Sequence, residues 1–272
     1  MAAHNSDDLA DAAVGALVDV VGLTPKPGLT DRRGPGPGSG TTDPATARWA
    51  AKSLLPGLAA MAAAARRSEG AGPRLREDLG SIGRCTEWTA RRAACGTDVH
   101  RGSVWALGLL TAAAALAPGA AAAEITAVAK SLAAARDRQA PRRPSRGSTA
   151  SARYGAAGAR GEARAGFPHV RRALEALRGA RDAGVTEEHA RVDALVTVMS
   201  TLQDTGPLYD AGPTGLRFVQ GGARAVLEAG GSSTGAGSEA LGALGAGLCE
   251  RGLRPGGSEP LLAAALFLDR LC

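Results

Sequence analysis

The chain has 272 residues, 44% of them hydrophobic, and its 32 Lys and Arg against 26 Asp and Glu give a formal net charge of +6. This length and composition are typical of a globular protein that buries a sizeable core. Aromatic residues make up only 3% of the chain and the basic residues are scattered among acidic ones, so we expect no nucleic-acid partner.

The sequence carries no signal for export or membrane insertion. Its first residues, MAAHNSDDLADAA, lack the basic and apolar regions of a signal peptide. The uncharged run at 102–123 is rich in alanine and is cut by Pro118-Gly119, which is typical of a buried helix rather than a membrane span. The four cysteines lack CxxC spacing and fit reduced thiols, buried or without a role. These features predict a cytoplasmic protein without a membrane partner.

Helical signals recur along the chain. The first predicted helix starts at Ser6, its candidate N-cap, and is ended by Gly22 and Pro25. The second opens with Asp43 as N-cap and runs toward residue 67, with a kink at Pro56. Further helices are predicted at residues 74–94, 102–116, 120–137, 168–182, 186–202, 214–228, 239–251 and 258–271.

Strand signals are nearly absent, because valine and isoleucine rarely alternate with polar residues and no Asn-Gly or Asp-Gly turn occurs. The pattern therefore predicts an all-α fold. We expect a single domain over residues 1–272, with functional residues on the inter-helix loops. The stretch 139–151, QAPRRPSRGSTAS, is the candidate for a mobile linker or lid and does not divide the domain.

Two inter-helix loops in the first half of the chain are richer in charge than a connection requires. In the loop at 23–33 two prolines stiffen the backbone that carries Lys26 and the Asp31-Arg32 pair. An ordinary turn with solvated charges is the alternative. In the loop at 95–102, Asp98, His100 and Arg101 stand just before a helix N-terminus, where anions are favoured. The alternative there is a capping aspartate beside a structural histidine.

Two loops in the second half are rich in glycine. At 154–168, glycines surround Arg160 and Glu162, so backbone could approach a ligand while Arg160 reaches phosphate and Glu162 takes a proton or a metal. A generic glycine-rich turn is the alternative. At 254–258 a Gly-Gly-Ser turn makes Ser258 a candidate N-cap for the last helix. Asp204 is expected to be a solvated carboxylate, and the histidines outside these loops are expected at the surface: His4, His169 and His189.

Six blocks, in order along nearly the whole chain, resemble the triphosphoribosyl-dephospho-coenzyme A synthase family, which makes the prosthetic-group precursor of citrate lyase and malonate decarboxylase. Arg101 and Trp105 look more like the malonate decarboxylase branch. The blocks are TPKPGLxDRR at 24–33, GxDxHRG at 96–102, YGxxGARGEAxxGFP at 154–168, Asp204-Thr205, GLRFVQ at 215–220 and PGGSxxLLAAxLFLD at 255–269.

The chain departs from the family pattern at several polar positions. Either the site tolerates these changes, or this member is slow or altered in specificity. The chain has Asp98-Val99 where the family usually has Asn-Thr, and Asp210-Ala211-Gly212 where it has Arg-Gly-Gly. An Asp-Asp-Thr-Asn-like run of the family is here Gln203-Asp204-Thr205-Gly206. Where the family has a His-x-Asp-hydrophobic-Asp element, this chain has Thr41, Asp43, Pro44 and Ala45, so the His and one Asp are lost.

The resemblance implies a transfer between two nucleotides. The 2′-hydroxyl of 3′-dephospho-coenzyme A attacks C1′ of the ribose of ATP, adenine leaves, and the triphosphate is retained. Because the transition state has oxocarbenium character, as in glycoside hydrolysis, a carboxylate near C1′ would stabilise it. The resemblance also implies Glu162 as general base, with His100 either orienting the nucleophile or protonating adenine.

It further implies residues that bind ATP and its Mg²⁺, and a later enzyme that consumes the product. Mg²⁺ would accompany the triphosphate through Glu87, Asp98 and Asp204. A further transferase would pass the product to an acyl-carrier subunit. The residues expected to bind the substrates are Lys26, Asp31, Arg32, Arg101, Gly102, Arg160, Gly161, Gly256, Gly257 and Ser258, of which Lys26 and the arginines would hold phosphates.

Two other functions are compatible with the sequence. The loss of the His-x-Asp-hydrophobic-Asp element fits a diverged paralogue that binds a nucleotide or coenzyme A derivative and regulates. An all-α enzyme that cuts another N-glycosidic or ADP-ribosyl bond would use the same carboxylates and Mg²⁺. Release of adenine that depends on dephospho-coenzyme A would distinguish the synthase from both of these alternatives.

Overall fold

The structure, a computed structural model, describes residues 4–34, 36–37, 42–141 and 144–272, and its regular secondary structure within these ranges is helical. The predicted all-α fold is therefore confirmed. The helices are α1 (Ser6–Gly22), α2 (Pro44–Lys52), α3 (Leu55–Arg66), α4 (Pro73–Ala93), α5 (Arg101–Leu116), α6 (Ala122–Ala134), α7 (Arg146–Tyr154), α8 (Gly158–Arg164), α9 (Pro168–Asp182), α10 (Glu187–Thr201), α11 (Thr205–Glu228), α12 (Gly235–Glu250) and α13 (Ser258–Leu271).

The first two helices begin at side-chain caps. Asn5 caps α1, since its Oδ1 accepts the backbone N–H groups of Asp7 and Asp8 at 2.8 and 2.9 Å. The expectation that Ser6 caps this helix is wrong, because the amide one residue earlier closes a capping box with Asp8. Asp43 caps α2, as predicted.

Several predicted boundaries are wrong. The helix expected from Asp43 toward residue 67 is two helices, α2 and α3, and Pro56 lies in the first turn of α3, where it interrupts no hydrogen bond. The expected linker at 139–151 contains the start of α7, which Ser145 caps, and the expected loop at 154–168 contains α8. Helix α11 starts at Thr205 instead of residue 214, with a break at Gly212.

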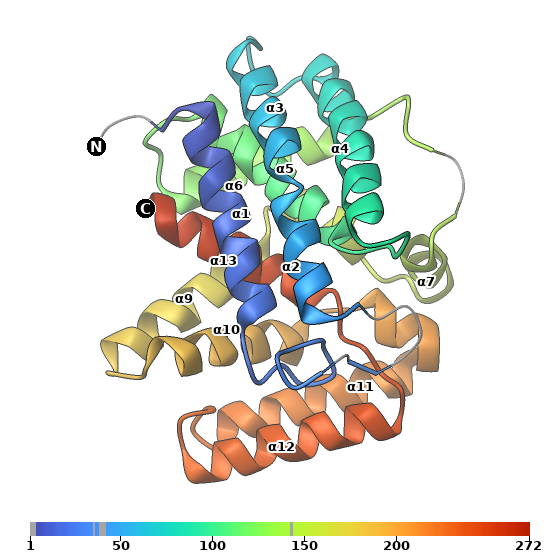
Figure 1. Ribbon diagram of the computed structural model, residues 1–272, viewed down its shortest axis with the longest axis vertical. Helices are drawn as coiled ribbons and strands as arrows, with labels where there is room; N and C mark the ends of the chain where they lie inside the picture. The colour runs from blue at the N-terminus through green and yellow to red at the C-terminus, as the bar shows by residue number, and fades with distance from the viewer. Residues whose placement is uncertain (1–3, 35, 38–41, 142–143) are drawn as a thin grey trace.

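Helix α5 is the centre of the hydrophobic core. Leu107, Leu110 and Ala113 have no exposed surface, and α5 packs against α3, α6 and α13. One continuous cluster of buried side chains extends from α1 through α5 to α13. Figure 1 shows how these helices are arranged in the bundle. The run at 102–123 is thus largely a buried helix, as predicted, and no helix in the described ranges is long and apolar enough to cross a membrane.

The loops and helix ends that carry most of the predicted site residues lie around the lower part of the bundle. The loop after α1 runs between the end of α1 and the α11–α12 pair (Figure 1). A Cβ at Gly28 would lie 2.8 Å from Leu248 of α12 and 2.9 Å from Pro255, so this loop packs directly on the connection to α13. Gly28 also has a φ of +68°, which favours glycine.

Gly57 of α3 lets this helix pack closely on α4, and we expect its replacement to change the free energy of unfolding. A Cβ at Gly57 would collide with the buried Thr86 of α4. Gly57→Ala should lower the free energy of unfolding by about 1–3 kcal/mol through overpacking. Gly179→Ala in α9, where nothing lies within 4 Å of an added Cβ, is the control and should be neutral or stabilising. Urea denaturation of both variants tests this, and equal stabilities would contradict it.

Candidate active site

Lys26 is held inside the protein by an ion pair that the sequence did not reveal. Its side chain is 1% exposed, and Nζ lies 2.6 Å from Glu259 Oε1 at the start of α13. Nζ also donates to the carbonyl of Val20 at 2.9 Å. Burial raises the pKa of Glu259, but the Lys26 ammonium outweighs this effect and keeps the pKa below its usual value. Lys26 therefore braces the loop against α13 instead of facing solvent.

Asp31 and Arg32, which the sequence treats as a pair, point in different directions. Asp31 is buried, accepts the backbone N–H of Lys26 at 3.0 Å and pairs with Arg33 at 2.8 Å. Burial acts to raise the pKa of Asp31, but the hydrogen bonds from Arg33 and Lys26 bring it below the usual value. Arg32 is exposed and contacts Glu188 of α10. Asp31 thus shapes the loop, and Arg32 extends from its surface.

His100 sits at the start of α5 with a left-handed backbone, φ 55°. Its Nε2 lies 2.7 Å from the carbonyl of Ala47, so this nitrogen carries a hydrogen and Nδ1 is the acceptor. Burial lowers the pKa of His100, with the Lys26 and Arg254 charges acting in the same direction. A Cβ at Gly102 would lie 2.7 Å from Pro260, so the start of α5 packs on the start of α13.

Asp204 joins the loop before α11 to the turn before α13. It is 5% exposed and accepts the backbone N–H groups of Gly206 at 2.9 Å and Gly257 at 2.8 Å. Burial raises its pKa to about 6, although both hydrogen bonds oppose the shift. A Cβ at Gly257 would meet Asp204 Oδ1 at 2.9 Å, which explains the glycine. The expectation of a solvated carboxylate is therefore wrong.

The turn that ends in Ser258 is closed differently from the prediction. Gly257, rather than Ser258, is the N-cap residue of α13. Ser258 is fully buried, and its hydroxyl donates to the carbonyl of Pro255 at 2.7 Å. Gly256 lies between them, half-buried, with its N–H bonded to the carbonyl of Arg254 at 2.9 Å. The Ser258 hydroxyl closes the turn and caps no helix.

Glu87, Asp98 and Arg101 form a second group at the end of α4 and the start of α5. Arg101 Nε lies 3.4 Å from Glu87 Oε2, and Arg91 Nε lies 3.5 Å from Asp98 Oδ1. Burial raises the pKa of Glu87, while the Arg101 charge opposes the rise. Asp98 and Arg101 are largely exposed. Their exposure leaves this group open to a ligand.

The three predicted metal ligands do not meet. Among the residues that the structure describes, no group of three His, Cys, Asp or Glu side chains could hold a metal ion. Glu87 and Asp98 belong to the group at the end of α4 and the start of α5, but Asp204 precedes α11 and is bonded to the turn before α13. The chain thus offers two neighbouring carboxylates, which suits a Mg²⁺ ion that arrives bound to phosphates better than a site made by protein alone.

Glu162 forms a buried pair with His169. Its Oε1 accepts the backbone N–H of His169 at 2.8 Å, and its Oε2 lies 2.7 Å from the ring nitrogen Nδ1. The side chains of Glu162 and His169 are 6% and 15% exposed, so the expectation of a surface histidine is wrong here. Arg160 and Gly161 lie on the same short helix, and Arg160 is exposed. Arg160 of α8 is thus exposed, whereas Glu162 of the same helix is buried against His169.

The site residues that sequence reasoning missed are Glu259, Arg254 and His169. Glu259 stands in the first turn of α13, where an acidic residue is ordinary, so only its contact with Lys26 distinguishes it. The charge of Arg254 acts to lower the pKa of both Asp204 and Glu259. Thr41, one of the positions that departs from the family pattern, lies outside the described residues.

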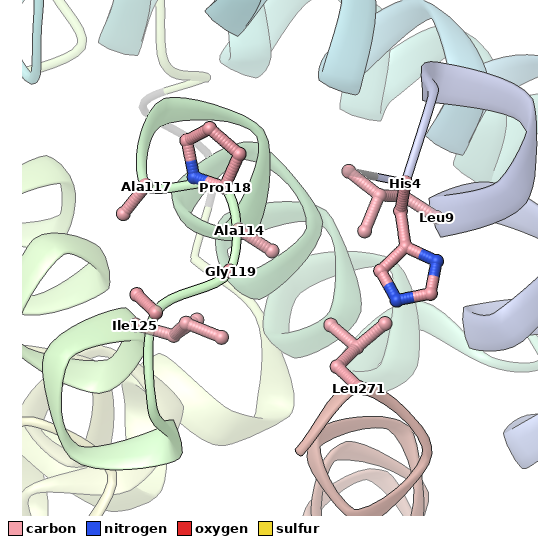
Figure 2. Close-up of a pocket in the computed structure, with 9 residues that line it drawn as sticks. His4, Leu9, Ala114, Ala117, Pro118, Gly119, Ile125 and Leu271 are labelled. Atoms are coloured by element: carbon pink, nitrogen blue, oxygen red, sulfur yellow. The ribbon is translucent and has the colours of Figure 1, made fainter. Parts of the chain in front are cut away.

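Of two hollows in the described surface, one lies apart from the paired charges above and the other includes Arg91, the partner of Asp98. The first, at the far end of α5, has a volume of about 10 Å³, barely room for one water. Figure 2 shows the His4 ring pointing toward Leu271 across this hollow, with Ala114 and Ile125 on its other side. The second is an open surface hollow beside the Asp98 loop, lined by Trp88, Arg91, Arg92, Cys95 and Gly96.

Comparison with known proteins places the chain in a family. Residues 6–272 match the model of the ATP:dephospho-CoA triphosphoribosyl transferase family. The chain belongs to this family. A probable 2-(5″-triphosphoribosyl)-3′-dephosphocoenzyme-A synthase of Stutzerimonas stutzeri is 48% identical over 98% of this chain and 92% of its own length. The similarly named protein of Azotobacter vinelandii is also 48% identical over the same shares. No solved structure matches the chain.

Membership confirms the resemblance in the sequence and makes the chain a transferase of the triphosphoribosyl-dephospho-CoA synthase type. The structure also shows what several blocks of this transferase do. The first block meets the last through Lys26 and Glu259, and Asp204-Thr205 meets the last through Gly257. The third block meets Asp204-Thr205, because a Cβ at Gly158 would lie 3.4 Å from Thr205 Cγ2, and Gln203, the residue before Asp204, accepts the N–H of Ala157 at 3.4 Å. The second block meets the last through Gly102 and Pro260, so five of the six blocks form one connected set.

The raised pKa of Asp204 predicts a pH dependence of stability in this synthase. With a pKa of about 6 against about 3.9 in an unfolded chain, the folded state binds the proton more tightly. The protonated carboxyl therefore stabilises the folded state fully below about pH 3.9, and this stabilisation is lost as the pH rises through about 6. Between about pH 7 and 4.5, wild type should gain about 2 kcal/mol relative to Asp204→Asn. Urea denaturation measures the difference, and a constant difference would contradict the raised pKa.

Proposed function

We propose that this chain transfers the 5-triphosphoribosyl group of ATP to the 2′-hydroxyl of 3′-dephospho-coenzyme A and releases adenine. The observation that carries the proposal is the family match over residues 6–272, together with relatives named as this synthase at 48% identity. The product would be the prosthetic-group precursor of an acyl-carrier subunit, handed on by a further transferase. Arg101 and Trp105 favour the malonate decarboxylase branch, and the four free cysteines favour a reducing compartment such as the cytoplasm.

The reaction exchanges one bond for another. The 2′-oxygen forms a bond to C1′ of the ATP ribose, the bond from C1′ to the adenine nitrogen breaks, and the hydroxyl proton passes to a base while adenine takes up a proton. Charge develops at C1′ in the transition state, where a carboxylate stabilises it. The triphosphate is unchanged and serves as the handle by which the enzyme holds the sugar.

Exposed arginines are the residues best placed to hold phosphates. Arg32, Arg101 and Arg160 are all exposed, and a guanidinium can bind phosphate with two hydrogen bonds. Lys26 is different, because its ammonium is buried against Glu259. Its role is to fix the loop that carries Arg32. Gly257 and Ser258 likewise position the turn beside Asp204 rather than contacting phosphate through side chains.

Glu162 and His100 are the candidates for proton transfer. A carboxylate has about four lone-pair sites, and His169 occupies two of those on Glu162, so the group can still accept a proton. His100 is neutral near pH 7, because burial lowers its pKa, and its Nδ1 is an acceptor. A neutral acceptor suits orientation of the attacking hydroxyl and does not suit protonation of adenine. We therefore favour the first of the two roles for His100.

Mg²⁺ would enter as part of the ATP substrate. Magnesium keeps several waters and substrate phosphates as ligands and needs only one or two protein carboxylates, and when bound it would neutralise triphosphate charge. Glu87 and Asp98 fit this limited role, since they are neighbours on the exposed group that includes Arg101. Asp204 fits it poorly, because both its oxygens receive backbone hydrogen bonds.

Analysis of the products tests the proposed function directly. Incubation with ATP, Mg²⁺ and 3′-dephospho-coenzyme A should yield adenine and a coenzyme whose mass is increased by the triphosphoribosyl group, measured by chromatography and mass spectrometry. Omission of dephospho-coenzyme A should abolish adenine release. Binding without release would indicate a regulatory paralogue, and release of free ribose triphosphate would indicate a glycosidase-type enzyme; either result overturns the proposal.

Replacement of Glu162 tests the proposed base. Glu162→Gln keeps an oxygen that can accept the N–H of His169, so the protein should fold, but kcat should fall by about 10²-fold or more while KM changes little. Glu175→Gln, at an exposed position of the neighbouring α9, is the matched control and should keep full activity. If Glu162→Gln matched this control, Glu162 would be left only with its contacts to α9.

A further inference from the structure

Arginines from α4 and α8 gather around Trp105 of α5, a residue that belongs to none of the loops described above. Arg76 of α4 places its guanidinium carbon 4.9 Å from the centre of the Trp105 ring on α5. The indole Nε1–H of Trp105 donates to the carbonyl of Ala159 at 3.1 Å, which ties α8 to the same place. Arg160 follows immediately along α8, and Arg164 anchors its Nε to the carbonyl of Ala133 at 3.3 Å. Helices α4, α5, α6 and α8 meet here.

Asp137 is the counter-charge of this cluster. Arg84 Nη1 lies 2.9 Å from Asp137 Oδ2, and Arg76 Nη1 lies 3.8 Å from the same oxygen. Among the described residues it is the only carboxylate in ion-pair distance of the four arginines 76, 84, 160 and 164. A Cβ at Gly80 would collide with its carboxylate, so glycine in α4 allows Asp137 to approach. One negative charge thus faces four positive ones.

Arg76 is the most informative member, because its side chain is only 10% exposed. Burial lowers its pKa, and the charges of Arg160, Arg84 and Arg164 act in the same direction against the effect of Asp137. Its nearest carboxylate oxygen, at 3.8 Å, is too far for a hydrogen bond. No Arg76 nitrogen is both buried and without a partner, so the donors of this guanidinium that Asp137 leaves free can be reached by an anion, and three cationic neighbours favour such an anion.

We propose that Arg76, Arg84, Arg160 and Arg164 form an oligophosphate-binding site, with Arg76 held in place by the face of Trp105 and by Asp137. Stacking on the indole fixes the plane of the guanidinium, and guanidinium edges match phosphate oxygens. Several arginines together suit a di- or triphosphate, whose charge is spread over many oxygens. None of these four arginines takes part in the contacts of Lys26 with Glu259 or of Asp204 with Gly257.

The inference rests on the proposed function for its choice of ligand. Both substrates carry an oligophosphate, the triphosphate of ATP and the diphosphate of dephospho-coenzyme A, so a transferase that holds both needs two cationic sites. Arg101, beside Glu87, is one candidate, and the cluster around Trp105 supplies the other. The shared ligand chemistry is an oligophosphate, and kinetics with each substrate in turn identifies its source.

Three variants test the site. Arg76→Gln and Arg164→Gln remove one buried and one exposed member, and Arg138→Gln, which breaks only the exposed pair with Glu77, is the matched control. The first readout is binding of inorganic tripolyphosphate by calorimetry. It should weaken at least tenfold in Arg76→Gln and Arg164→Gln and be unchanged in Arg138→Gln. Arg164→Gln keeps the test valid if Arg76→Gln does not fold.

The second readout is KM for each substrate, from initial rates of adenine release. A rise of about tenfold or more for dephospho-coenzyme A alone assigns the site to its diphosphate, and a rise for ATP alone assigns it to the triphosphate. Tripolyphosphate binding that weakens in a protein without synthase activity would support the site and refute the proposed function. Binding and KM values equal to those of Arg138→Gln would overturn the site while leaving the function intact.

Discussion

The ion pair between Lys26 and Glu259 is the contact on which the arrangement of the loops depends. It joins the loop after the first helix to the first turn of the last helix, 233 residues apart. Because the ammonium is almost entirely removed from water, removal of Glu259 would leave a buried unpaired charge, which costs more than the pair itself contributes. His100 and Arg254 lie close enough to shift the pKa of Glu259. The pair therefore acts as the centre of a polar network.

The apolar core gives this network a rigid base. Helices α1, α5 and α13 share one cluster of small and medium apolar side chains, and both α5 and α13 begin beside the network. Alanine and glycine let these helices pack closely, so their N-terminal ends are fixed relative to each other. Loops on such a scaffold can hold polar groups with little freedom to move, as binding and catalysis require.

The fold was largely predictable because the long helices carry their own signals. Apolar periodicity and the cap at Asp43 locate them from local sequence. The short helices α7 and α8 escaped prediction, since their sequences are rich in serine, glycine and arginine. They are held by contacts with distant residues, such as those of Trp105 with Ala159 and Gln203 with Ala157. Such tertiary contacts override weak local propensity.

The candidate site was predictable as a set of loops but not as a set of roles. Lys26 and Arg32 stand in the same loop with the same charge, yet one is buried and the other exposed. From the sequence Asp204 resembled any solvated carboxylate just after a helix, and only its bond to Gly257 shows that it lies in the interior. The direction in which a side chain points depends on the partner that the fold places next to it. In these loops the partner comes from a distant part of the sequence, so the sequence of the loop alone does not reveal it.

The contrast between buried and exposed charged residues explains why residues of the same motifs differ in what they do. Three charged residues have partners inside the protein. Lys26 pairs with Glu259, Asp204 accepts backbone N–H groups, and Glu162 contacts His169. Arg101 and Arg160 remain exposed. Two polyanionic substrates repel each other, so an enzyme that joins them needs exposed cations whose positions are fixed by something other than the substrates. The pair of Lys26 with Glu259 fixes the loop from which Arg32 extends, so the structure fixes that cation without any help from a substrate.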